Sequence, residues 1–165
     1  MNRIALLLAT ALCLPWSQAS ADEATFMTKN MTVETALKAA QVALKSCRDG
    51  GYQVAVAVVD RGGNTQVMLR DRFAGPHTPE TARRKAWTAV SFRTNTSGLA
   101  GQTQPGQMQS GMRDIPGALA LGGGLTIEAA GSLVGAIGVS GAPGGDLDDA
   151  CAQAGIDAVA DDLAF

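Results

Sequence analysis

The sequence predicts an α+β fold in which helices pack against an antiparallel sheet of about five strands. Apolar residues recur at helical spacing in three segments, and short Val-rich or apolar runs bounded by glycine-rich turns are typical of strands. Because short turns join the strand-like runs, neighbouring strands should be antiparallel. The expected order is α-β-β-α-β-β-β-α in one domain spanning residues 22–165, with sheet and helices as two layers.

The first half should contain a helix followed by a strand pair. Thr32 is a favourable N-cap and Gly50 a favourable stop, and small and apolar residues recur between them at helical spacing. Residues 52–60 are rich in Val, which is typical of a mostly buried strand. The Arg-Gly-Gly-Asn sequence at 61–64 indicates a turn, and residues 65–70 should return as the paired strand.

A second helix should follow the strand pair and lead into a long connection. Thr78 can cap this helix, with a proline at its first position, where a missing N–H is tolerated. Residues 94–113 contain Gly, Pro, Gln and Ser without a clear period. We expect an irregular connection there, with a short helical turn around Met108 and Met112, and loops of this length tend to be functional or mobile.

The last third should return to the sheet and end in a helix. Strands are expected at 118–121, 125–129 and 133–140, separated by turns that contain glycine. Asp146 can cap the last helix. With the other acids of the first turn, it should also compensate the positive end of the helix dipole; these acids are Asp146, Asp148 and Asp149.

The first 21 residues have the pattern of a secretory signal peptide. Arg3 supplies the positive start, residues 4–14 form an apolar run too short to span a bilayer, and Ala-Ser-Ala at 19–21 fits the cleavage rule near Ala21. We therefore expect a periplasmic or secreted protein with no later transmembrane segment. Removing Arg3 changes the net charge from −2 to −3, which argues against a nucleic-acid partner.

Two cysteines follow this leader, Cys47 and Cys151, each on the apolar face of an expected terminal helix. An even pair in an oxidising compartment favours a disulfide if the two helices pack side by side. The alternative is two separate buried thiols, which a small apolar side chain such as Cys tolerates.

The candidate site centres on His77, the one histidine of the chain. It lies in a turn between the strand pair and the second helix, where an imidazole can reach a metal or a haem iron. Zinc is poorly supported, since one His and two distant Cys do not supply its ligand set. A haem site needs only an axial ligand, an apolar slot and often a cation for the propionates.

Other residues near or beyond this turn could complete a haem site. Arg84, Arg83 or Arg72 could pair with propionates, and Met108 and Met112 could supply a second ligand or apolar walls. Judged singly, these residues also fit ordinary roles. The arginines suit a solvated helix face, the methionines suit gap-filling in a core, and His77 suits a surface loop.

Four ordered motifs resemble the GlcG/HbpS haem-binding protein family, which also includes the C-terminal domain of PduO-type proteins. They are residues 54–63 (VAVAVVDRGG), Arg70-Asp71 with Ala74, residues 84–89 (RKAWTA) and residues 138–145 (GVSGAPGG). The resemblance implies a profilin-like α+β fold, homo-oligomers, and haem binding in some members. It makes His77 the preferred axial iron ligand, with Thr78 or a methionine as alternatives, while no clear Glu-x-x-Glu iron motif is present after the leader.

The leading hypothesis is a periplasmic or secreted haem-binding protein that carries, buffers or senses haem through His77, without catalysis of its own. A second is a non-haem small-molecule binding or accessory module of the GlcG type, whose pocket for an organic acid is shaped by residues 94–113. A third is an enzyme in which His77 acts as a general base near Asp71 or Glu80.

Overall fold

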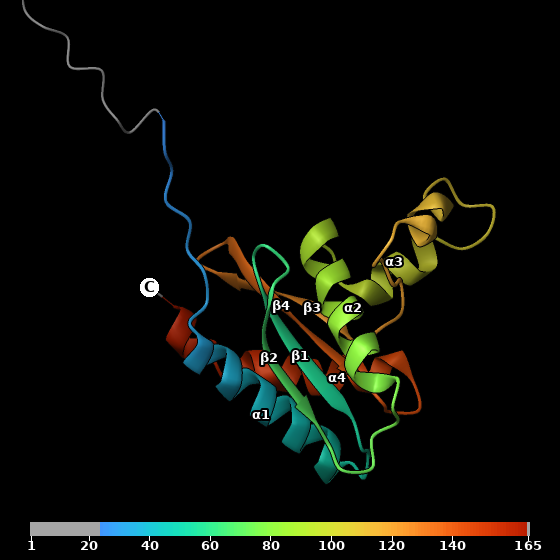
Figure 1. The fold of residues 1–165 in the computed structure, drawn as a ribbon, viewed down its shortest axis with the longest axis horizontal. Helices are drawn as coiled ribbons and strands as arrows, with labels where there is room; N and C mark the ends of the chain where they lie inside the picture. Colours follow the sequence, from blue (N-terminus) through green and yellow to red (C-terminus); the bar gives the residue numbers. More distant parts are fainter. Residues whose placement is uncertain (1–23, 165) are drawn as a thin grey trace, which may run out of the picture.

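The computed structural model describes residues 24–164, and their strands form one four-stranded antiparallel sheet (Figure 1). The strands are β1 (Ala55–Asp60), β2 (Thr65–Arg70), β3 (Gly124–Ala129) and β4 (Ser132–Ser140). Their order is β2-β1-β4-β3, and each neighbouring pair is antiparallel. Two hairpins, β1–β2 and β3–β4, therefore lie side by side and meet at β1 and β4, which confirms the predicted fold class.

Helices cover both faces of this sheet (Figure 1). On one face lie α1 (Val33–Asp49) and α4 (Gly145–Asp157), packed against each other, and on the opposite face lies α2 (Thr78–Phe92). Three shorter helices complete the described chain: α3 (Thr96–Gln102), η2 (Ser110–Asp114) and η3 (Asp161–Leu163). The sheet is thus the middle of three layers, whereas the sequence suggested two.

The alternation of side chains along β1 explains why both faces are covered. Val56 and Val58 belong to the core shared with α1 and α4, whereas Ala55 and Ala57 pack with Ala82 of α2. A strand that is buried on both sides needs apolar residues at every position. This is why residues 54–59 form a continuous apolar run.

Small residues let α2 approach the sheet closely. Ala82, Ala86 and Ala89 are fully buried on the side of the helix that faces the sheet. At Gly138 of β4, a Cβ atom would lie 2.1 Å from the carbonyl oxygen of Ala82, so only glycine fits there. This packing fixes the position of α2, and of the turn before it, relative to the sheet.

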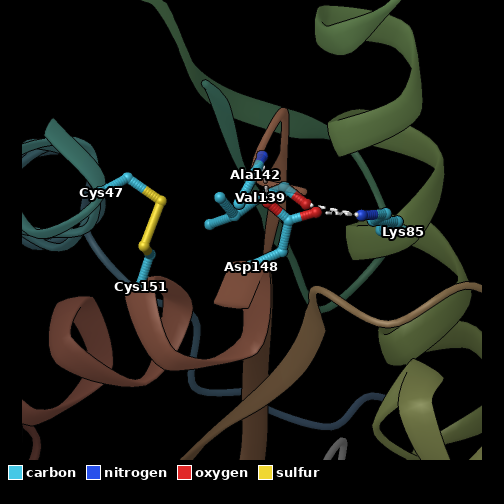
Figure 2. Close-up of a disulfide and its surroundings, with 6 residues drawn as sticks. All are labelled: Cys47, Lys85, Val139, Ala142, Asp148 and Cys151. Atoms are coloured by element: carbon cyan, nitrogen blue, oxygen red, sulfur yellow. Dashed lines mark hydrogen bonds and ion pairs between the residues drawn. A yellow bond between two sulfur atoms is a disulfide. The ribbon is translucent and has the colours of Figure 1, made fainter. Parts of the chain in front are cut away.

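A disulfide between Cys47 and Cys151 joins α1 to α4 (Figure 2). The two Cα atoms are 5.4 Å apart, and the two residues are 104 positions apart in the sequence. The bridge confirms the expected pairing, and the alternative of two separate thiols is wrong. In the chain-entropy model a closed loop of this length stabilises the fold by about 4.7 kcal/mol.

Residues 118–121 do not form the expected strand, so the sheet has four strands and not five. Their backbone groups pair with side chains of α2 instead. The carbonyl oxygen of Ala118 accepts a hydrogen bond from Arg84 Nη2 at 2.6 Å, and the N–H of Leu119 donates to Thr88 Oγ1 at 2.8 Å. These bonds satisfy backbone groups that a sheet would otherwise have to pair.

Two helices begin differently from the sequence prediction. Thr78 is the first residue of α2 and not its cap, and His77 occupies the cap position without a side-chain capping bond. The cap of α4 is Gly144, while Asp146 lies exposed in the first turn. The expected caps therefore lie one or two positions inside their helices. A shift of this size is common, because helix ends are the least predictable feature of a helix.

The connection between α2 and β3 is more helical than predicted. It contains α3, which the sequence pattern did not indicate, and η2, which includes Met112 where a short helical turn was expected. Across residues 24–164, no helix combines the length and the apolar character needed to cross a membrane. The leader predicted at 1–21 lies outside the described residues.

Candidate functional site

A pocket of about 690 Å³ lies between the first turn of α2 and the first turn of α4. Residues 51–53, which precede β1, and residues 140–145, which follow β4, form its other walls. We call it the α2–α4 pocket. Its volume falls within the range of roughly 300–1,000 Å³ that is typical of small-molecule and cofactor sites.

His77 lies at the edge of this pocket, directly before α2, with an exposed side chain. Its ring packs against the backbone of Gly75, where a Cβ atom would lie 2.8 Å from His77 Cε1, so a larger residue there would displace the ring. The hydroxyl of Thr78 donates to the carbonyl oxygen of Gly75 at 2.8 Å, and that threonine is buried. These contacts hold the turn that presents the imidazole.

Arg84 also lines the pocket, and the protein holds it in place. It is half-buried, with Nε donating to the carbonyl oxygen of Gly117 at 3.3 Å and Nη2 donating to that of Ala118 at 2.6 Å. Arg83 instead pairs with Glu80 at 2.7 Å on the surface, and Arg72 is not among the pocket residues. Of the arginines considered as propionate partners, the structure brings only Arg84 to the pocket.

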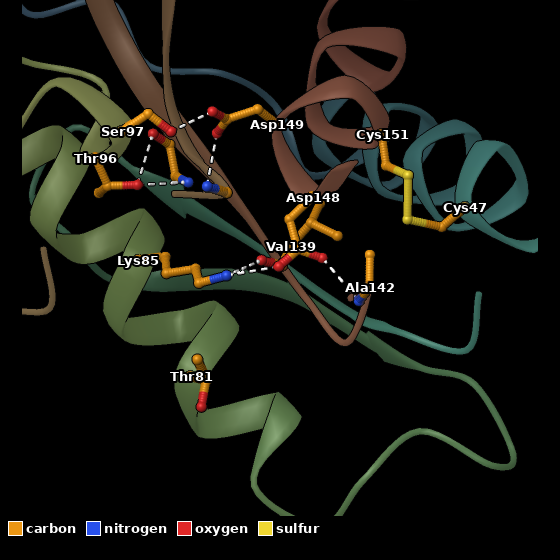
Figure 3. A network of polar contacts seen from close by, with 12 residues as sticks. Cys47, Thr81, Lys85, Thr96, Ser97, Val139, Ala142, Asp148, Asp149 and Cys151 are labelled. Carbon is orange, nitrogen blue, oxygen red and sulfur yellow. Dashed lines mark hydrogen bonds and ion pairs between the residues drawn. A yellow bond between two sulfur atoms is a disulfide. The ribbon is translucent and has the colours of Figure 1, made fainter. Parts of the chain in front are cut away.

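A buried ion pair forms the inner part of the pocket (Figure 3). Lys85 Nζ of α2 lies 2.7 Å from Asp148 Oδ2 of α4, and the two side chains are 1% and 5% exposed. Lys85 also donates to the carbonyl oxygen of Val139 at 2.9 Å, while Asp148 Oδ1 accepts from the N–H of Ala142 at 3.0 Å. Burial raises the pKa of the Asp148 carboxyl above its ordinary value, and the hydrogen bond from Lys85 opposes this rise.

This ion pair connects three parts of the molecule that form the pocket: helix α2, the end of β4 with the turn after it, and helix α4. The sequence reasoning missed it, because it assigned Asp148 to dipole compensation. One signal was available. Lys85 is three residues after Ala82 and four before Ala89, so it lies on the small-residue face that packs on the sheet.

Asp149 has a separate structural role on the next position of α4 (Figure 3). Its Oδ1 accepts a hydrogen bond from the N–H of Gly123 at 2.6 Å, and its Oδ2 accepts one from the hydroxyl of Ser97 in α3. The hydroxyl of Thr96 accepts from the N–H of Gly124 at 2.8 Å. These bonds attach α3 to β3 and α4, beside the pocket.

The structure brings together three of the predicted site residues and separates the other two from them. His77, Thr78 and Arg84 all line the α2–α4 pocket, whereas Met108 and Met112 do not. Met108 is 96% exposed and lies at a hollow of about 200 Å³ that three glutamines share. Neither methionine lies where it could serve as a wall or as a second ligand for a group held by His77 in this pocket.

The carboxylates considered as partners for a catalytic His77 are both engaged elsewhere. Asp71 is buried and accepts two hydrogen bonds from Arg48, the shorter at 2.6 Å, and these lower the pKa of the Asp71 carboxyl. The hydrogen bond from Arg83 likewise lowers the pKa of Glu80. The geometry therefore gives no support to His77 as a general base oriented by either acid.

The sequence reasoning also missed apolar residues at the pocket. Phe73 is 79% exposed and Leu121 is 48% exposed, and both line it. Within residues 24–164, no three His, Cys, Asp or Glu side chains gather to hold a bare metal ion. The pocket lining suits a ligand that has an apolar surface and anionic groups. If such a ligand contains a metal, the ligand itself must supply most of the groups that coordinate the metal.

The fold is a small α+β domain, and it carries a pocket whose volume is typical of small-molecule and cofactor sites. The family described as "Haem degrading protein HbpS-like" matches residues 31–157. The chain therefore belongs to the HbpS-like family, which confirms the resemblance seen in its motifs.

Solved structures and characterised sequences extend this comparison. A double mutant of HbpS from Streptomyces reticuli is 40% identical with a TM-score of 0.77, covering 94% of this chain and 97% of that chain. A PduOC:heme complex is 28% identical with a TM-score of 0.73, covering 78% of this chain and 94% of that chain. The corrinoid adenosyltransferase PduO of Citrobacter freundii is 36% identical over 90 residues, which span 53% of this chain and 27% of that protein.

Proposed function

We propose that this protein binds haem in the α2–α4 pocket, with His77 as an axial iron ligand, and that it carries, buffers or senses haem. The observation that carries the proposal is the convergence of His77, Arg84 and two exposed apolar side chains, Phe73 and Leu121, on one pocket of about 690 Å³. A haem site needs an accessible axial ligand, apolar contact surface and a cation for the propionates.

The residues present fit this group. His77 is exposed, so its imidazole is accessible to an iron. Arg84 is fixed by two backbone carbonyls and can still donate to a propionate through a charge-assisted bond. Phe73 and Leu121 offer the flat, apolar macrocycle a surface that excludes water. When bound, haem supplies a redox-active iron, and the chain supplies an axial ligand and the surrounding polarity.

The comparisons support the proposal. The chain belongs to a family described as haem degrading, and a similar solved structure is a complex with heme. We extend haem binding from those relatives to this protein on the basis of its own pocket. The choice of His77 as ligand comes from its position at the pocket and from its being the one histidine of the chain.

We also propose a periplasmic or secreted location and a homo-oligomeric state. The signal-like pattern at residues 1–21 supports the location, and so does the Cys47–Cys151 disulfide, because such bonds persist in oxidising compartments. Fractionation of cells that express the full chain tests the location. Light scattering of the purified protein tests the oligomeric state, and a mass equal to one chain would contradict it.

A titration with hemin tests the proposed function. The wild-type protein should give a saturable, shifted Soret band, and His77→Ala should alter that band and weaken binding by about tenfold or more. Met108→Ala is the matched control, because this side chain is exposed and lies outside the pocket. Equal spectra and affinities for wild type and His77→Ala would remove His77 from the site.

The polar side of the pocket supports a second candidate, a site for a small organic acid. Arg84 lines the pocket and can attract an anion, and so can the N-terminus of α2, whose first turn faces the pocket. Residues 94–113 do not line this pocket, so they do not shape the site in the way the sequence suggested. An acid that raises the melting temperature, together with hemin that binds no better than to albumin, would favour this candidate.

A further inference from the structure

One wall of the α2–α4 pocket is a loop of small residues between β4 and α4. Its sequence is Gly-Ala-Pro-Gly-Gly, and all five residues, 141–145, line the pocket. We call it the wall loop. Its two ends pack closely on neighbouring backbone, Gly141 on residues 53–54 and Gly145 on Gly122. Its middle has no large side chain of its own to anchor it, so it depends on contacts from other elements.

Asp148 of α4 supplies the contact that holds the middle of the wall loop (Figure 3). The N–H of Ala142 donates to Asp148 Oδ1 at 3.0 Å. Within residues 24–164, no other backbone N–H of the wall loop donates a hydrogen bond. The position of Ala142 beside the pocket therefore depends on the position of one carboxylate.

That carboxylate is held in turn by α2. Lys85 Nζ lies 2.7 Å from Asp148 Oδ2 and donates to the carbonyl oxygen of Val139, two residues before the wall loop, at 2.9 Å. Helix α2 also carries Arg84 and begins directly after His77, and both of these line the pocket. The ion pair thus connects the wall loop to the helix that presents the candidate ligand-binding side chains.

No comparable link joins α2 to α4. The two helices lie on opposite faces of the sheet. Among the hydrogen bonds and ion pairs of residues 24–164, the one between Lys85 and Asp148 is the one that joins these helices. A buried polar network in which every member is satisfied is rigid, so this contact fixes the geometry around it.

We propose that Lys85 and Asp148 are positioning residues of the binding site, and that their ion pair sets the affinity of the pocket by fixing the wall loop relative to α2. They act without contacting the ligand, because both side chains are almost fully buried. This inference rests on the proposed haem site, since hemin is the ligand with which affinity is measured. It predicts that affinity depends on the pair even where stability does not.

Two double variants separate affinity from stability. Lys85→Met with Asp148→Leu removes the charges and the acceptor for the N–H of Ala142, whereas Lys85→Met with Asp148→Asn removes the charges and keeps an amide oxygen for that N–H. Neither leaves a buried charge without a partner, so both should fold. The affinity for hemin should fall about tenfold in the leucine variant and about threefold in the asparagine variant, which keeps half of the link.

Val159→Ala is the control for a loss of stability alone. Val159 is fully buried in the core that α1 and α4 share, and it lies outside the pocket. Its truncation should lower the urea concentration at the midpoint of unfolding, because it leaves a cavity. The affinity of this variant for hemin should stay within about twofold of wild type.

Hydrogen exchange of the wild-type protein supplies a measurement that needs no variant. Mass spectrometry of peptides that cover the wall loop should show one slowly exchanging amide, that of Ala142, in the ligand-free protein. Hemin should slow this exchange further as the site fills, because a ligand that binds the anchored loop suppresses its opening.

Several results would overturn the inference. They are a hemin affinity of the leucine variant equal to that of wild type, equal losses in the leucine and asparagine variants, a loss as large in Val159→Ala, and exchange at Ala142 that hemin does not change. If the wild type fails to bind hemin, the proposed function and this inference both fail. A leucine variant that binds hemin as wild type does removes this inference alone.

Discussion

Replacing Lys85 with methionine should destabilise the protein strongly, because it leaves Asp148 buried without its cation. The two side chains are 1% and 5% exposed, and Lys85 Nζ bonds to both Asp148 and the carbonyl oxygen of Val139. Removing one partner of such a buried pair costs about 3–5 kcal/mol. Small domains have a total stability of about 5–15 kcal/mol, so the free energy of unfolding should lose a large fraction.

The assay is urea unfolding followed by the fluorescence of Trp87, the one tryptophan outside residues 1–21. Its ring lies against Gly63 and Gly117, so its emission reports the packing of α2 against the neighbouring segments. Lys85→Met combined with Asp148→Leu should recover most of the loss, because an apolar pair leaves no uncompensated charge. The reasoning is refuted if the single variant loses less than about 1 kcal/mol or if the double variant is no more stable than the single ones.

The pH dependence of the Lys85→Met variant follows from the same contact. Burial already raises the pKa of Asp148 in the folded protein, and loss of Lys85 removes the group that opposes this rise. When the pKa of an acid is higher in the folded than in the unfolded state, the protein becomes less stable as the pH rises through that folded pKa. The variant should therefore be closer to wild type in mildly acidic buffer than in mildly alkaline buffer.

Two further perturbations test the elements that surround the pocket. Cys47→Ser should lower the free energy of unfolding by about 4.7 kcal/mol, measured by urea unfolding, because it opens the loop that the bridge to Cys151 closes. The hydrogen bond from Arg48 lowers the pKa of Asp71 in the folded state, so the stability that Asp71 contributes is present above about pH 4 and is lost as the pH falls through the folded pKa. Asp71→Asn should therefore flatten the acid limb of the stability profile, which is the fall in the free energy of unfolding at low pH.

Each of these perturbations has a control within the chain. Wild-type protein unfolded with a reducing agent should match Cys47→Ser, and equal midpoints with and without the reducing agent would contradict the role of the disulfide. Asp49→Asn removes a surface carboxylate that pairs with Lys45 in an exposed ion pair. Asp49→Asn should leave the fall in stability at low pH close to that of wild type. If Asp71→Asn also gave the same pH profile as wild type, Asp71 would not be the group that causes this fall.

The sequence pattern predicted the elements whose signals are continuous and local. Helix α1 has a cap, a periodic face and a glycine stop, and β1–β2 has a buried apolar run, a turn signal and a returning strand. The disulfide could be predicted because both cysteines fall on the apolar faces of helices that pack together. In these cases local propensity and tertiary packing favour the same structure.

Elements that depend on distant partners could not be predicted in the same way. Residues 118–121 have an apolar composition that suits a strand, but α2 supplies their hydrogen bonds through Arg84 and Thr88. The ion pair between Lys85 and Asp148 joins residues 63 positions apart. No local period reveals such a pair, although the place of Lys85 on a small-residue helix face was a usable signal.

The candidate site was predicted in part. His77 was selected as the one histidine of the chain, Arg84 as a cation for a propionate, and Thr78 as an alternative ligand that the family resemblance implies. The pocket contains all three. Met108 and Met112 were selected by residue type alone, and the connection that carries them lies outside the pocket. Phe73 carries no motif, and only the fold shows that it shares the pocket with His77.

A crystal structure of the protein with hemin, phased at the iron absorption edge, tests the central claim most directly. The account predicts an anomalous iron peak in the α2–α4 pocket at coordination distance from an imidazole nitrogen of His77. An iron peak bound by another residue, or one outside this pocket while the pocket stays filled with solvent, would contradict it.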